Sequence, residues 1–205
     1  MRESSRTVLM TQRVIVDSAT GERRDGLDQR WPRFLHSVGL TGVAVPNILE
    51  LIDDLFEKFK PIGVLLTGGN DLGSVGGDAK DRDAVEDRIV EFARSQRLPL
   101  LGVCRGMQVI QQSFGIRLQP VEGHVKARQT INVLGSPQTV NSYHRFGTCE
   151  SVDTLAVCAR SEDGVIKMVR AVDEPILGIM WHPERCVPIR AEDDALFRDF
   201  FRAAQ

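Results

Sequence analysis

Short apolar runs alternate with amphipathic segments through the first half of the chain, and this alternation restricts the folds that it can adopt. Strands that are buried on both faces of a parallel sheet are continuously apolar, and four runs have this character. They lie at 7–11, 42–45, 63–67 and 99–103. Helical patterns between them cover 27–38, 49–59 and 81–97. This alternation indicates βαβ units and a parallel sheet with helices on both faces.

The second half of the chain changes to β-type segments separated by turn residues. These segments are TINVLG, TLAVCA, VIKMVRAV and PILGIMWH, and an amphipathic helix is expected over 191–203. Because no repeat, linker or low-complexity tract divides the sequence, we predict a single domain of the α/β class over residues 1–205. Its expected architecture is a three-layer α/β/α sandwich with a mostly parallel central sheet and an additional small β-rich region.

Composition and charge exclude several classes of function. Apolar residues make up 42% and charged residues 26% of the chain, which is typical of a soluble folded protein. The formal net charge of -2 provides no basic field that would attract nucleic acid or a membrane surface. No apolar stretch approaches the roughly 20 residues of a membrane span, and the first residues lack a signal-peptide pattern. These features predict a cytoplasmic protein with small-molecule partners, no nucleic acid and no membrane.

The cysteines and histidines are too scattered to predict a metal site or a disulfide framework. They are Cys104, Cys149, Cys158 and Cys186, with His36, His124, His144 and His182. No C-x-x-C pair and no pair of histidines one helical turn apart occurs among them. We expect no bound metal, and we expect Cys149, Cys158 and Cys186 to pack passively or to lie at the surface.

The segment PLLGVCRGMQVIQQSFG places Cys104 between a buried strand and an amphipathic helix. A sharp strand-to-helix turn lifts a side chain above the carboxyl edge of the sheet, and it requires small neighbours such as Gly102 and Gly106. The helix N-terminus and the adjacent Arg105 would place positive charge beside the sulfur, which favours a thiolate. A buried structural cysteine is the alternative, but this turn favours a nucleophile.

A second motif, WHPE, follows an apolar strand near the end of the chain. Its extended backbone projects His182 and Glu184 toward the same side, because side chains two residues apart share one face of a strand. A catalytic histidine needs a partner on its distal nitrogen that fixes its tautomer, and a carboxylate at this spacing can serve. A satisfied core histidine is the alternative interpretation of His182.

Together, GVCRGMQ and WHPE resemble the motifs of the class I glutamine amidotransferase and γ-glutamyl hydrolase superfamily, which includes peptidase C26. The resemblance implies a flavodoxin-like fold and a catalytic triad of Cys104, His182 and Glu184. It extends to LLTGGNDL at 65–72, where members of this superfamily build an oxyanion hole. By this resemblance, the backbone N–H groups of Gly69 and Arg105 would stabilise a tetrahedral oxyanion.

The same resemblance implies how a γ-glutamyl group would bind. VNSYH is similar to the segment whose backbone holds the α-amino and α-carboxylate groups, which assigns Asn141, Ser142 and Tyr143. Gln108 matches the residue that contributes a side chain. The implied reaction passes through a γ-glutamyl thioester, releases glutamate and an amine, and needs no cofactor.

Three functions remain open. A stand-alone γ-glutamyl amide hydrolase is preferred, because CRGMQ is more similar to γ-glutamyl hydrolases than to glutaminases, which usually carry leucine after the nucleophile. TQR, RRDGLDQRW, GHV and GIMWHPER further resemble γ-glutamyl-CDP-amidate hydrolases of capsule phosphoramidate synthesis, which makes γ-glutamyl-CDP-amidate the preferred substrate. The second function is a glutaminase subunit that supplies ammonia to a separate synthase, and the third is a noncatalytic binding protein. A synthase or a second copy of the chain stays open as a partner.

Two groups of side chains receive no assigned role. Arg23, Arg24, Arg30 and Arg33 could bind a phosphate through paired hydrogen bonds, or they could form a solvated helix face. His124 and His144 lie in segments that match the superfamily, but their spacing assigns neither of them to the triad.

Overall fold

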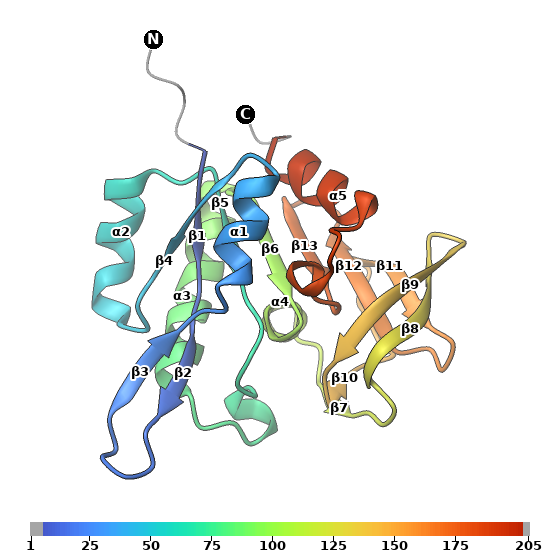
Figure 1. Ribbon diagram of the computed structural model, residues 1–205, viewed down its shortest axis with the longest axis horizontal. Coiled ribbons are helices and arrows are strands. Elements are labelled where there is room, and N and C mark those ends of the chain that lie inside the picture. The colour runs from blue at the N-terminus through green and yellow to red at the C-terminus, as the bar shows by residue number, and fades with distance from the viewer. Residues whose placement is uncertain (1–5, 203–205) are drawn as a thin grey trace.

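The computed structural model describes residues 6–202, and a nine-stranded sheet runs through it (Figure 1). Across the sheet the strands are β4 (Thr41–Ala44), β1 (Thr7–Met10), β5 (Gly63–Leu66), β6 (Leu100–Val103), β13 (Ile176–Ile179), β12 (Ile166–Ala171), β11 (Leu155–Ser161), β8 (Val125–Val133) and β9 (Ser136–Tyr143). The strands from β4 to β13 pair in parallel. Those from β12 to β9 are antiparallel to their neighbours.

Helices cover both faces of this sheet. On one face lie α1 (Arg30–Ser37) and α5 (Ala191–Arg202), and on the other α2 (Ile52–Phe59), α3 (Lys80–Gln96) and α4 (Arg105–Ser113). Aromatic pairs join the helices within each layer, with ring centroids 4.7 Å apart for Phe34 and Phe197 and 4.1 Å apart for Phe56 and Phe92. The predicted three-layer α/β/α sandwich is confirmed. Ala203, which the predicted last helix includes, lies outside the described residues.

The apolar patterns explain these elements. In β1, β5, β6 and β13 every residue is buried, which is why each reads as a continuous apolar run. In α3, Val85, Ile89 and Ala93 form the buried stripe. Short 3-10 helices at η1 (Leu49–Leu51), η2 (Gly73–Val75) and η3 (Pro183–Arg185) complete the connections. The core therefore lies on both sides of the parallel strands.

The β-rich second half extends the main sheet, and its antiparallel strands continue directly from β13. Two small sheets stand apart at the lower edge in Figure 1: β2 (Arg13–Val16) with β3 (Arg23–Gly26), and β7 (Gln119–Pro120) with β10 (Phe146–Gly147). The β2–β3 hairpin was not predicted from the sequence. Its turn is built by Asp17, whose carboxylate accepts hydrogen bonds from the N–H groups of Ala19 and Thr20.

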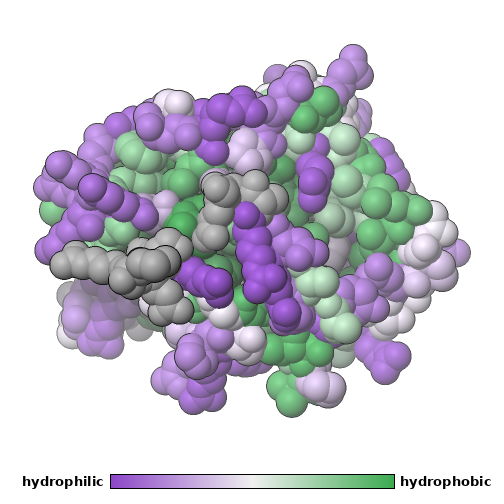
Figure 2. All heavy atoms as spheres, turned by 90° about the horizontal axis from the view of Figure 1, so that it is seen from above, coloured by the Kyte–Doolittle hydropathy of each residue, from purple (hydrophilic) through white to green (hydrophobic). Residues whose placement is uncertain are grey.

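The edge of the molecule above the sheet in Figure 1 carries hydrophilic side chains with smaller hydrophobic areas between them (Figure 2). Among residues 6–202, no helix is both long enough and apolar enough to cross a membrane. The single-domain organisation over 1–205 stays a prediction.

Candidate active site

Cys104 occupies the sharp turn between β6 and α4. Its backbone has φ 55° and ψ -106°, a combination that residues other than glycine rarely adopt. The Cys104 N–H donates to the Ile179 carbonyl over 2.8 Å, which fixes the turn to β13. Strained backbone of this kind persists only where the surrounding structure determines it, and it occurs mainly at functional sites.

Two glycines allow this turn to pack closely. A Cβ atom added to Gly102 would collide with the backbone of Gly106, and one added to Gly106 would collide with the backbone of Leu66. These neighbours cannot shift easily, because α4 and β5 hold them in place. The crossing of α4 over the sheet therefore requires the small residues that the sequence places around Cys104.

His182 and Glu184 lie just beyond the carboxyl end of β13. Because β13 pairs in parallel with β6, the chain leaves both strands at the same edge of the sheet, where Cys104 also lies. His182 Nδ1 is 2.7 Å from Glu184 Oε1, and both side chains are buried. Asn141 fixes the backbone here, because its amide donates to the His182 carbonyl and accepts from the His182 N–H, each over 2.8 Å.

The surroundings of His182 favour its protonated form. Burial of the imidazole opposes protonation, but the negative charge of Cys104, a hydrogen bond with Cys104 and the hydrogen bond with Glu184 together raise the pKa of His182 to about 9. An imidazolium beside a thiolate can give a proton to a leaving group after the sulfur has attacked. The arrangement is therefore suited to acyl transfer.

Two cavities adjoin these side chains. The first, of about 340 Å³, is bordered by Cys104 and Tyr143 among others. The second, of about 300 Å³, is bordered by His182 and Trp31. Arg13 borders both cavities. Cys104 and His182 thus face two spaces that can hold two parts of a substrate.

The loop after β5 passes beside Cys104 and His182. A Cβ atom added to Gly68 would lie 3.5 Å from Cys104 Cβ and 2.7 Å from His182 Cε1. Gly69 has φ +92° and borders the first cavity. Within residues 6–202, the N–H groups of Gly69 and Arg105 have no hydrogen-bond acceptor. Both are available to an oxyanion, and their role stays a prediction.

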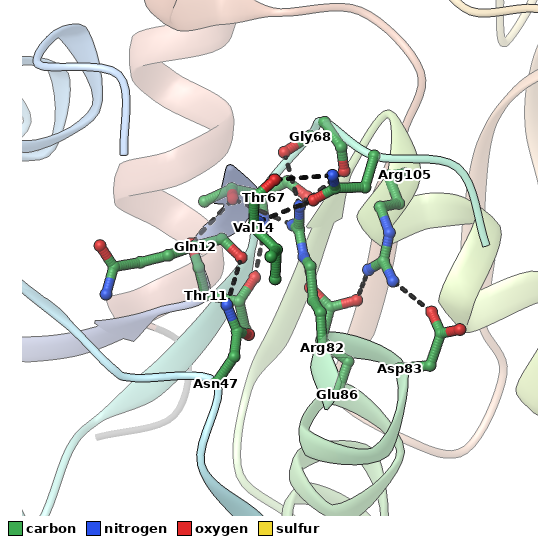
Figure 3. Close-up of polar contacts among 12 residues, drawn as sticks. Thr11, Gln12, Val14, Asn47, Thr67, Gly68, Arg82, Asp83, Glu86 and Arg105 are labelled. Carbon is green, nitrogen blue, oxygen red and sulfur yellow. Dashed lines mark hydrogen bonds and ion pairs between the residues drawn. The ribbon is translucent and has the colours of Figure 1, made fainter. Parts of the chain in front are cut away.

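The side chain of Arg105 is directed to α3. The sequence predicts that Arg105 adds positive charge beside the sulfur, but its guanidinium pairs with Asp83 over 2.5 Å and with Glu86 (Figure 3). These two carboxylates neutralise it. The structure therefore gives no support to the expectation that the charge of Arg105 favours a Cys104 thiolate. The predicted role of Arg105 is then limited to its backbone N–H group.

The residues predicted to bind a glutamyl group divide into two pairs. Gln108 and Tyr143 border the first cavity, and Gln108 Nε2 donates to the Phe146 carbonyl over 2.9 Å. Asn141 and Ser142 are buried and use their side chains within the protein. Asn141 and Ser142 could therefore contact a glutamyl group only through their backbone. Glutamyl binding by all four residues stays a prediction.

A buried lysine, Lys167, joins the two histidines whose role was open. Its ammonium lies 2.9 Å from His124 Nδ1, 2.6 Å from His144 Nε2 and 3.3 Å from Ser142 Oγ. Burial and the charge of Lys167 lower the pKa of His144 to about 3, so this ring is neutral. The histidines therefore belong to a network that anchors the end of β9 beside the first cavity.

The four arginines considered for a phosphate site lie on two elements. Arg23 and Arg24 are on β3, whereas Arg30 and Arg33 are on α1. The interpretation that all four form one solvated helix face is therefore wrong. Carboxylates neutralise three of the four: Arg23 pairs with Asp81, Arg24 with Glu22 and Arg30 with Asp28. None of the four is among the described residues that border the two cavities. They give no support to phosphate binding.

The sequence interpretation missed the buried charges around the site. Arg82, Glu86 and Lys167 are at most 1% exposed. The available signal was a charged pair at i, i+4 on the core-facing stripe of α3, and a lysine within an apolar strand. In the part of the chain that the structure describes, no group of three or more His, Cys, Asp or Glu side chains could hold a metal ion.

Sequence comparisons relate the chain to known proteins. The family model described as Peptidase C26 matches residues 11–184. A γ-glutamyl-CDP-amidate hydrolase of Campylobacter jejuni is 29% identical over 178 residues, covering 86% of this chain and 88% of that protein. A glutamine-hydrolysing GMP synthase subunit of Methanococcoides burtonii is 28% identical over 189 residues, covering 84% and 88%.

A structural comparison gives the same fold. The crystal structure of a protein from Thermoplasma acidophilum, described as a GMP synthase subunit, matches with a TM-score of 0.73 and 21% identity, covering 96% of this chain and 94% of that one. The family match covers most of the chain, including the β6–α4 turn and the segment after β13. The chain thus belongs to the Peptidase C26 family and is a class I glutamine amidotransferase-like protein.

Proposed function

We propose that the chain hydrolyses γ-glutamyl amides, with Cys104 as nucleophile, His182 as general acid and base, and Glu184 as the residue that orients His182. The observation that carries this proposal is the placement of Cys104 on a strained turn beside a buried His182, whose Nδ1 atom lies 2.7 Å from Glu184. Membership of Peptidase C26 supports a hydrolase.

The reaction would begin with attack of the Cys104 sulfur on the γ-carbonyl carbon. The N–H groups of Gly69 and Arg105 would donate to the oxyanion, and each such donor typically contributes about 3–4 kcal/mol. As the C–N bond breaks, His182 Nε2 gives its proton to the departing nitrogen, which leaves a γ-glutamyl thioester. His182 then takes a proton from the water that attacks the thioester, glutamate departs, and the Cys104 thiolate is restored.

We place the glutamyl group in the first cavity. Gln108 and the backbone of 141–143 would hold its α-amino and α-carboxylate groups, since Gln108 and Tyr143 border this space together with Cys104. The Lys167 network supports this assignment, because it anchors Ser142 and the end of β9 from within the protein. A rigid wall of this kind would hold the γ-carbonyl near the sulfur.

For the leaving group we prefer the amidate of a nucleoside diphosphate, as in γ-glutamyl-CDP-amidate. Arg13 borders both cavities, and Arg145 borders the first. Neither guanidinium forms a hydrogen bond or ion pair with any residue in 6–202. Guanidinium groups bind phosphate oxygens through paired hydrogen bonds, so these two cations suit an anionic leaving group. The similarity to the Campylobacter hydrolase supports the same substrate.

A glutaminase subunit is the second candidate. The 28% identity to the glutamine-hydrolysing GMP synthase subunit of Methanococcoides burtonii favours it. Such a subunit would hydrolyse glutamine weakly on its own, and faster when a synthase partner binds. A noncatalytic binding protein is less well supported, because Cys104, His182 and Glu184 retain the arrangement that acyl transfer needs.

Glutamate release from four substrates tests the proposal: γ-glutamyl-CDP-amidate, γ-glutamyl-GABA, a γ-glutamyl anilide and glutamine. We expect purified protein to turn over the CDP-amidate with kcat/KM at least about tenfold above that for glutamine, because the unpaired arginines stabilise only the charged leaving group. Faster turnover of another adduct would reassign the leaving group. Weak turnover of glutamine alone, or inactivity on all four, would favour a glutaminase subunit whose synthase partner is missing. Activity that does not require Cys104 would exclude the mechanism.

Arg13→Gln should raise KM for the CDP-amidate by about tenfold, the effect of losing one charge-assisted hydrogen bond. The γ-glutamyl anilide, which lacks phosphate, should be hydrolysed at nearly the wild-type rate. Steady-state kinetics on both substrates measure this, with Arg33→Gln on α1 as the matched control. Equal losses on both substrates would show that Arg13 acts on the γ-glutamyl site and not on a phosphate.

A further inference from the structure

Arg82, on α3, is fully buried beneath the loop that follows β5 (Figure 3). Its Nη2 atom donates to the Thr67 carbonyl over 2.7 Å, and its Nη1 atom donates to the carbonyls of Gly69 over 2.6 Å and Gly68 over 3.2 Å. The planar fork of a guanidinium can serve several acceptors at fixed angles. One side chain therefore gathers three consecutive carbonyl groups of the loop.

The charge of Arg82 is balanced on the side away from the loop carbonyls. Its Nε atom lies 2.9 Å from Glu86 Oε1, one helical turn along α3. Glu86 also pairs with Arg105, whose guanidinium reaches Asp83 (Figure 3). Burial lowers the pKa of Arg82 to about 9, so it is still a cation at neutral pH. The guanidinium is thereby fixed between α3 and the loop.

Peptide geometry links these carbonyls to the site. In a planar trans peptide, the C=O group and the following N–H group point in opposite directions. With the carbonyls of 67–69 directed to Arg82, the N–H groups of Gly68, Gly69 and Asn70 point away from it. Successive N–H groups on one side of a loop form a concavity that attracts negative charge.

These N–H groups lie where an oxyanion would develop. Gly69 and Asn70 border the first cavity with Cys104, and Gly68 packs on Cys104 and His182. Within residues 6–202, none of the three N–H groups has a hydrogen-bond acceptor. Asn70 also ties the loop to β2, because its side chain pairs with the N–H and C=O of Val14, each over 2.9 Å.

We propose that Arg82 is a positioning residue for the oxyanion hole: it holds the carbonyls of Thr67, Gly68 and Gly69 so that the Gly69 N–H faces the reacting carbonyl. The inference rests on the proposed γ-glutamyl amide hydrolysis. Arg82 does not touch the substrate, and it acts by fixing the orientation of the peptide between Gly68 and Gly69. If the ion pair between Arg82 and Glu86 contributed only to the stability of the fold, loss of Arg82 would not change the orientation of this peptide.

Arg82→Lys is the first test, because lysine keeps a positive charge near Glu86 but replaces the planar guanidinium fork with one ammonium nitrogen. That nitrogen cannot hold Glu86 and the carbonyls of 67–69 at the same fixed angles. We expect kcat for the best substrate to fall by about 10–100-fold and KM to change by less than about threefold, since the lost interaction forms only in the transition state. Alkylation of Cys104 by iodoacetamide displaces iodide without forming an oxyanion, so its rate should stay within about threefold of wild type.

Arg88→Lys is the matched control, because Arg88 lies on the same helix and pairs with Asp53 at the surface. It should leave kcat and the alkylation rate unchanged. If Arg82→Lys fails to fold, Arg82→Gln is the second variant, because it removes the guanidinium while Glu86 keeps its ion pair with Arg105. Wild-type kcat in either folded variant would overturn the proposal, as would a parallel loss of hydrolysis and alkylation.

A crystal structure of the folded variant separates this inference from the proposed function. We expect the peptide between Gly68 and Gly69 to rotate when Arg82 no longer holds its carbonyl. An unchanged peptide would overturn the role of Arg82, whatever the activity. A rotated peptide in a protein whose wild type lacks Cys104-dependent turnover would support that role and contradict the proposed hydrolysis.

Discussion

Replacing Cys104 with alanine should lower kcat/KM for γ-glutamyl amide hydrolysis by about 10⁴-fold or more, because it removes the atom that forms the thioester. Water would then have to attack the amide directly, and His182 would lose the negative charge that raises its pKa. Glutamate release measures the loss. Mass spectrometry of quenched reactions should detect a γ-glutamyl adduct on the wild-type protein and none on the variant.

Cys104→Gly offers a matched variant with a second readout. Because Cys104 has φ 55° and ψ -106°, glycine should be as inactive as alanine but more stable than it by about 1 kcal/mol, as the strained backbone is relieved. Chemical denaturation measures the difference. Cys149→Ala, at an exposed cysteine, should retain full activity. Turnover that survives in Cys104→Ala would exclude the cysteine mechanism.

The parallel half of the sheet could be predicted because the residues within each of its strands are enough to identify it as a strand. β5 and β6 are buried on both faces, so their apolar runs stand out against the amphipathic helices beside them. The β2–β3 hairpin could not be predicted in the same way. Its second strand is RRDG, which has no apolar residue, and its position depends on distant contacts such as the ion pair between Arg23 and Asp81.

The proximity of Cys104 and His182 could be predicted from the resemblance of their two motifs to one superfamily, and the parallel pairing of β6 with β13 supplies its physical cause. The directions of Asn141 and Ser142 could not, because they depend on how β9 pairs with β8 and packs on the His182 backbone. For Arg82, the sequence offers only its i, i+4 spacing with Glu86 on the core-facing stripe of α3, and its contacts with the loop could not be predicted for a similar reason. A charged side chain in a helix usually indicates a surface, and only the folded loop supplies the carbonyls that make burial favourable.

Glu184→Gln should lower kcat by about 10²–10⁴-fold with little change in KM, an effect of the size seen when the carboxylate of other triads is replaced. The carboxylate accepts the His182 Nδ1–H over 2.7 Å and thereby leaves Nε2 to exchange protons with the substrate. A glutamine amide can donate to Nδ1 instead, which favours the wrong tautomer. Glu192→Gln, at an exposed position on α5, is the matched control and should retain wild-type kcat.

The pH dependence of Glu184→Gln tests whether the contact between Glu184 and His182 raises the pKa of His182. Because the pKa of His182 is raised to about 9, the imidazolium that protonates the leaving nitrogen persists through neutral pH and is lost as pH rises through about 9. The alkaline limb of the kcat/KM profile should therefore lie near that pH in the wild type. Glu184 is one cause of the raised pKa, so the limb should move to lower pH in Glu184→Gln. An unmoved limb would contradict this expectation: either the limb reports a group other than His182, or Glu184 orients His182 without raising its pKa.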